Sequence, residues 1–99
     1  MNRDLIIAAL RAHQDELRSL GVKSLALFGS VARGQTRPGS DIDIAAVYDD
    51  SIVHDLMGMG GVAAEIASCL GTDDFDLANE ANLSPHIRGQ FMREHVRIF

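Results

Sequence analysis

The sequence contains no tryptophan, one cysteine and one lysine, and these shortages exclude several classes of protein. A lone thiol, Cys69, cannot form an internal disulfide or a cysteine-based zinc site. Its place in a helical pattern favours a small buried residue. Long apolar runs are missing as well: the longest span five or six residues. They are too short to cross a bilayer, so no membrane partner is expected.

Positive charge is also scarce. Nine Lys and Arg residues stand against 14 Asp and Glu, which gives a net charge of −5. Nucleic-acid binding requires clustered Lys and Arg to neutralise phosphates, and here only Arg88, Arg93 and Arg97 gather in one region. We interpret these three as solvated helix charge, with a phosphate or partner patch as the alternative. No direct nucleic-acid contact is therefore expected.

Targeting signals, repeats and linkers are not visible either. The chain shows no basic start followed by an apolar stretch and a small-residue cleavage site. Its 99 residues suffice for one domain, residues 1–99, and not for two. We expect a single domain that is cytoplasmic by default.

Apolar periodicity predicts helices alternating with short strands. Residues 4–20 form an amphipathic helix in this interpretation, with one apolar stripe made of Ile6, Leu10, His13, Leu17 and Leu20. Gly21 should end it. Strands are predicted over 23–28, 41–47, 74–78 and 96–99, and helices over 30–34, 51–70 and 85–94. The expected fold class is α/β (α+β), a small mixed sheet flanked by helices.

Two aspartates alternate with isoleucines in the second predicted strand. Ile42 and Ile44 should face the core, so Asp41 and Asp43 share the opposite face. Carboxylates about 6 Å apart repel by roughly 3 kcal/mol at an effective dielectric constant near 20, unless a cation or strong donors lie between them. Mg²⁺ binds one or two carboxylates and completes its shell with water and phosphate oxygens. The pair therefore predicts a magnesium site.

A glycine-serine turn precedes this strand. Gly29 allows a sharp turn and the close approach of a ligand. Ser30 would begin a short helix, where free N–H groups attract an anion. Phosphate-binding turn and metal ligands together suit a nucleoside triphosphate such as ATP.

A third carboxylate is expected because two-metal phosphoryl transfer needs a group near the attacking oxygen. Asp76 is the preferred candidate, since its strand neighbours Phe75 and Leu77 would point into the core. Asp74 has the same parity and remains an alternative. Gly-Ser or Asp-x-Asp alone is common in turns and exposed strands. The combination in this order and spacing points to nucleotidyl transfer.

These motifs resemble the DNA polymerase β-like nucleotidyltransferase superfamily, and within it the minimal nucleotidyltransferases of prokaryotic toxin–antitoxin pairs. The similarity covers nearly the whole chain. It includes GSVARG (residues 29–34), SDID (40–43), FDLA (75–78) and the closing SPHIRGQFMREHVRIF (84–99). The first two motifs are the specific ones.

The resemblance implies a role for each matching residue. Gly29 and Ser30 would hold the triphosphate of ATP, and the motif adds Arg33 and Ser40 to the nucleotide-binding loop. Asp41, Asp43 and Asp76 would bind Mg²⁺ in a two-metal arrangement, with Asp76 also activating the acceptor hydroxyl. For Arg33, a surface arginine paired with a nearby acid is the alternative.

The resemblance also implies a partner. Family members of this size move AMP from ATP to a tyrosine of a HEPN-type toxin, and so act as the antitoxin of a type VII-like toxin–antitoxin pair. A chain this short leaves the acceptor to a small molecule or to another protein. Two alternatives stay open: an antitoxin that neutralises its toxin by binding alone, and an enzyme that modifies a small molecule such as an aminoglycoside.

Overall fold

The alternating apolar segments form one mixed sheet. The computed structural model describes residues 2–35 and 41–99, so most of the turn predicted at 35–40 lies outside the described residues. Four strands line up in the order β3-β2-β1-β4: β1 (Val22–Phe28), β2 (Ile42–Tyr48), β3 (Phe75–Asn79) and β4 (Val96–Arg97). β1 is antiparallel to β2 and β4, whereas β2 and β3 are parallel. The predicted fold class is confirmed.

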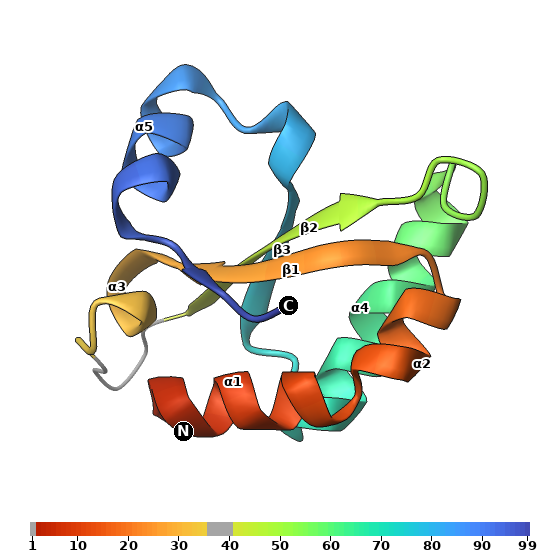
Figure 1. Cartoon of the computed structure of the whole chain (residues 1–99), viewed down its shortest axis with the longest axis horizontal. Helices are drawn as coiled ribbons and strands as arrows, with labels where there is room; N and C mark the ends of the chain where they lie inside the picture. The colour runs from red at the N-terminus through yellow and green to blue at the C-terminus, as the bar shows by residue number, and fades with distance from the viewer. Residues whose placement is uncertain (1, 36–40) are drawn as a thin grey trace.

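Helices lie on both faces of this sheet (Figure 1). The described helices are α1 (Arg3–Ala12), α2 (Gln14–Ser19), α3 (Gly29–Ala32), α4 (Leu56–Leu70), α5 (Pro85–Glu94) and the 3-10 turn η1 (Glu80–Asn82). Figure 1 shows α1, α2 and α4 below the sheet and α5 above it. None of the helices in the described ranges is long and apolar enough to cross a membrane.

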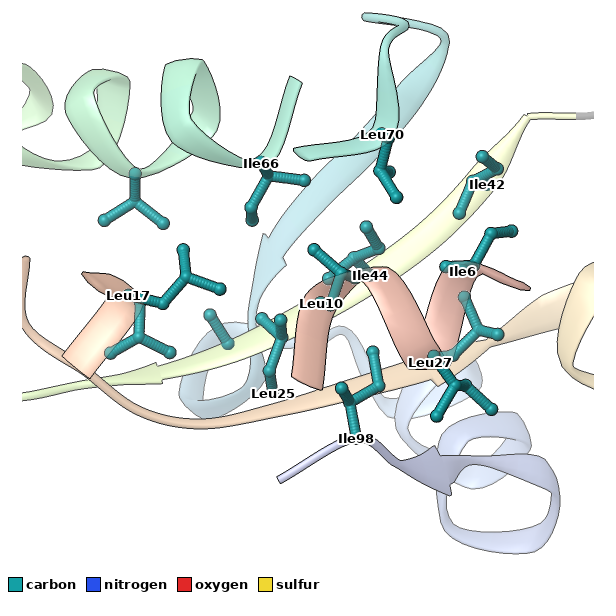
Figure 2. Packing of buried hydrophobic residues seen from close by; sticks show 14 of the residues in the cluster. Ile6, Leu10, Leu17, Leu25, Leu27, Ile42, Ile44, Ile66, Leu70 and Ile98 are labelled. Atoms are coloured by element: carbon teal, nitrogen blue, oxygen red, sulfur yellow. The ribbon is translucent and has the colours of Figure 1, made fainter. Parts of the chain in front are cut away.

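The main core lies between the sheet and α1, α2 and α4. Ile42 and Ile44 of β2 point into it, as predicted, and are 8% and 0% exposed. Figure 2 shows the large side chains meeting there: Ile6, Leu10, Leu17, Leu25, Leu27, Ile66, Leu70 and Ile98. A smaller cluster of Ala26, Ala45 and Phe91 covers the other face, with Phe28 and Leu83 packed against it. Both clusters fix which face of β2 carries the aspartates.

The first predicted helix is interrupted. Residues 4–20 form two helices because His13 leaves helical geometry, with φ −108° and ψ 21°. One nitrogen of the His13 ring lies 2.9 Å from the Ala9 carbonyl oxygen. The apolar stripe holds through Leu17, but Leu20 is 38% exposed and its placement in the stripe was wrong. Leu20 is the C-cap of α2, so it lies beyond the last residue of the helix.

Helix α4 starts later than predicted. Asp49 accepts hydrogen bonds from the backbone N–H and the hydroxyl of Ser51, at 3.0 and 2.6 Å, and so forms a turn instead of a helix start. The N-cap is Asp55, whose carboxylate accepts from the Gly58 N–H at 2.8 Å. The predicted end is confirmed: Gly71 adopts φ 71°, the left-handed conformation of a helix C-terminus.

We predict that Gly60→Ala stabilises the protein. Gly60 lies inside α4 with negative φ, and a Cβ there would contact nothing within 4 Å. Alanine should add about 0.5–1 kcal/mol by reducing the entropy of the unfolded chain. In a domain of this size that corresponds to a rise in Tm of about 2–8 °C, measured by circular dichroism.

Gly21→Ala is the matched control and should act in the opposite direction. Gly21 has φ 104°, and an added Cβ would lie 2.5 Å from Cγ2 of Val53. Strain and overlap together should lower Tm. Equal effects of the two substitutions would contradict this account of the glycines.

Candidate active site

The carboxylates predicted from the sequence lie at one end of the strands, where β1 ends and β2 and β3 begin. Asp43 pairs across β1 with Phe28, the last residue of that strand. On its other side it pairs with Asp76 of the parallel strand β3. Asp41 is exposed and directly precedes β2. Three separate segments therefore bring Gly29 and two aspartates to the same place.

Gly29 lies against the carboxylate of Asp43. Its φ of 77° is in the left-handed region, and a Cβ added there would overlap the Asp43 side chain. Glycine is therefore required at position 29 for two reasons: the positive φ of the turn and the close approach of the Asp43 carboxylate. Ser30 follows in α3, which is only one turn long. Anion binding here would depend on local N–H groups more than on the dipole of a long helix.

The electrostatics of Asp43 reflect this crowding. Burial is the largest cause that raises the pKa of its carboxyl group, followed by the negative charges of Asp76 and Asp41. The positive charge of Arg33 lowers the same pKa and only partly offsets these effects. The negative charges around Asp43 thus outweigh the positive charge of Arg33.

This chemistry fits a hard cation. In the part of the chain that the structure describes, no three His, Cys, Asp or Glu side chains are gathered closely enough to hold an ion. Repulsion among the carboxylates favours such separation. Asp43 is half-buried and Asp76 is exposed on the adjacent strand. Carboxylate oxygens of this kind are nevertheless the donors that Mg²⁺ selects when phosphate oxygens complete its shell.

The strand register distinguishes the two candidates for the third carboxylate. Asp76 is the residue paired with Asp43, and its charge affects the Asp43 pKa. Asp74 precedes β3, where its carbonyl oxygen accepts from the Ile42 N–H at 3.4 Å. Asp76 therefore belongs to the same cluster as Asp43 and Asp74 lies at its margin. Ser40, the remaining predicted residue, lies outside the described residues.

Arg33 forms the ion pair that its alternative interpretation predicts, whereas its role in the nucleotide-binding loop stays a prediction. Its Nη1 donates to Glu94 of α5 at 2.6 Å, so it does pair with a nearby acid. It also follows α3 directly, where its backbone N–H donates to the Gly29 carbonyl at 3.3 Å. Glu94 had not been considered from the sequence, although an acid in the last turn of a helix opposes the helix dipole and is a usable signal.

Two grooves of the described residues lie away from these carboxylates. One, of about 340 Å³, lies between β2, β3 and α4 and is lined by Tyr48, Leu56, Met59, Gly60, Ala63, Leu77 and Asn79. Another, of about 280 Å³, is lined by Val47, Glu80, Ala81, Arg88, Phe91 and Met92. Neither includes Asp41, Asp43 or Asp76.

A glycine-serine turn against paired aspartates of a mixed sheet is typical of a nucleotidyltransferase. The family model described as polymerase beta nucleotidyltransferase matches residues 7–99, and the chain belongs to this family. It is a homologue of protein adenylyltransferase MntA of Thermococcus cleftensis. The two are 30% identical over 94 residues, which cover 94% of this chain and 92% of the relative.

Solved structures extend the comparison to complexes. One matching chain comes from a toxin–antitoxin structure with AMP-PNP; its sequence is 27% identical and the TM-score is 0.66. The match covers 100% of this chain and 73% of the chain in that structure. The fold is shared with a complex of tri-AMPylated Shewanella oneidensis HEPN toxin and MNT antitoxin, at 23% identity and a TM-score of 0.63. That match covers 94% of this chain and 71% of that one.

We predict that Asp43→Asn stabilises the metal-free protein at pH 7. The folded-state pKa of Asp43 lies above its unfolded value of 3.8. The folded state therefore binds the proton more tightly, and its stability falls as pH rises from the unfolded value through the raised one. Asparagine removes this loss. Urea unfolding with EDTA should show a gain at pH 7 that shrinks towards pH 4.

Asp49→Asn provides the control with the opposite sign. Hydrogen bonds from Ser51 are the main cause that lowers the pKa of Asp49, so its ionised form favours the folded state. That contribution is present above the unfolded pKa and is lost as pH falls through the folded pKa. Its replacement should bring no gain at pH 7. A gain for both variants would indicate a general charge effect in place of burial and repulsion at Asp43.

Proposed function

We propose that this chain transfers AMP from ATP to a hydroxyl group, expected to be a tyrosine, of a HEPN-family toxin. The observation that carries the proposal is the position of Asp43, which pairs with Asp76 and lies against Gly29. This arrangement suits the reacting phosphates and their metal, and the homologue is a protein adenylyltransferase. In this proposal residues 1–99 act as one domain, in the cytoplasm where ATP is available.

Two groups of residues would bind ATP, the donor of AMP: those of the turn after β1, and the three aspartates. N–H groups of the turn at Gly29 and Ser30 would bind the triphosphate, with Arg33 adding charge from the end of α3. Asp41 and Asp43, with Asp76, would hold Mg²⁺. The metal would neutralise the phosphate oxygens and stabilise the charge that develops during transfer. A negative net charge makes such a cation necessary before ATP can approach these carboxylates.

The acceptor half needs a second molecule. The attacking hydroxyl oxygen would form a bond to the α-phosphorus, the bond to the pyrophosphate would break, and the hydroxyl proton would pass to a base. Asp76 is exposed on the edge strand and is the proposed group to orient the hydroxyl and receive this proton. The net charge of −5 would also complement a partner with a basic surface.

The test combines this chain with its HEPN-type partner, ATP and Mg²⁺. Intact-mass spectrometry should show additions of one AMP each on the partner. Asp43→Ala should lower the rate by at least about a hundredfold, because metal-assisted charge stabilisation contributes several kcal/mol to the reaction. EDTA should stop the wild-type reaction and excess Mg²⁺ should restore it.

Two controls separate this proposal from its alternatives. Glu65→Gln replaces an acid of α4 outside the site and should leave transfer unchanged. A triple variant of Asp41, Asp43 and Asp76 should fail to neutralise the toxin. Full neutralisation by that variant would favour inhibition by binding alone. ATP consumption with an aminoglycoside and no partner protein would favour a small-molecule acceptor.

A further inference from the structure

Residues of helix α5 contact the chain on both sides of the proposed phosphate-binding turn. Before the turn, the ring of Phe28 packs edge-on against Phe91, with ring centroids 5.6 Å apart and planes at 75°. After the turn, Arg33 pairs with Glu94 at 2.6 Å. Phe91 is buried, so the helix is anchored where it meets the sheet. Gly29 and Ser30 therefore lie between two contacts that come from one helix.

Glu94 is unfavourably placed for helix stability alone. It is the last residue of α5, where the helix dipole is negative and a carboxylate is repelled. The preceding residue, Arg93, is basic and is the type that favours this end. The Glu94 side chain is 28% exposed, and Arg33 supplies the opposite charge. The pair stabilises an acid that the helix itself would disfavour.

Arg33 has competing acids on two sides. Glu94 binds its guanidinium directly, and the charge of Arg33 also reaches Asp43. Without Glu94, the guanidinium would be drawn towards the carboxylates that the metal requires. Glu94 would thus keep the arginine at the rim of the site, available to phosphate oxygens and away from the metal ligands.

We propose that Glu94 is a positioning residue for the donor nucleotide, which holds Arg33 beside the turn at Gly29 and Ser30. The inference rests on the proposed function for its substrate, ATP. Glu94 itself touches neither substrate nor metal in this proposal. Its effect passes through Arg33, so the two residues must act as one unit.

The test measures nucleotide binding and transfer separately in the full chain. Calorimetry gives the Kd of Mg²⁺–AMP-PNP, and toxin modification gives KM for ATP and kcat. Glu94→Gln should raise Kd and KM about three- to tenfold, or about 0.7–1.4 kcal/mol, and change kcat by less than about twofold. Combined with Arg33→Gln, it should add little to the effect of Arg33→Gln alone.

Glu80→Gln is the matched control. It breaks the ion pair between Glu80 and Arg97, which spans 3.2 Å with side chains 20% and 42% exposed. A similar ion pair is thus lost away from the turn, and Kd and KM should stay at wild-type values. Unfolding curves should show that all the variants remain folded, since these side chains are partly exposed.

Several outcomes would overturn the proposal. Unchanged Kd and KM in Glu94→Gln would do so, as would additive effects of the Glu94 and Arg33 substitutions or an equal effect of Glu80→Gln. Wild-type protein that binds Mg²⁺–AMP-PNP but modifies no toxin would contradict the proposed acceptor, while the binding data would still decide the role of Glu94. Wild-type protein that binds no nucleotide would contradict both.

Discussion

The organisation of this site depends on the parallel pairing of β2 and β3 at Asp43 and Asp76. The register places two carboxylates side by side. Burial is the largest cause that raises the pKa of Asp43, and the negative charge of Asp76 adds to it. Burial of Ile42 and Ile44 on the opposite face fixes that register, because a shift by one residue would turn both isoleucines to solvent. Hydrophobic burial thus holds together charges that would otherwise separate.

Glycine at position 29 is the second part of the same constraint. The carboxylate of Asp43 occupies the space that any side chain at residue 29 would need. The turn at Gly29 and the carboxylate of Asp43 are therefore in close contact. Such preorganisation favours phosphoryl transfer, where catalysis is chiefly positioning and charge stabilisation.

The features that follow from short-range rules could be predicted from the sequence. Two-residue alternation gave the faces of β2, and the glycine-serine pair gave the turn. The break at His13 and the late start of α4 could not be read from periodicity, because local hydrogen bonds of His13, Asp49 and Asp55 decide them. The ion pair of Arg33 with Glu94 joins residues 61 positions apart, and no local pattern encodes it.

Distance along the chain also decides which residues of the candidate site can be grouped from the sequence. Gly29, Asp41 and Asp43 lie within one short segment, whereas Asp76 and Glu94 reach the site only through the sheet and α5. Beyond Asp76 the edge strand β3 has no further neighbour in the described sheet. The groups that would hold an acceptor hydroxyl are therefore expected from a partner, and the surface of that partner must complete the geometry that this chain begins.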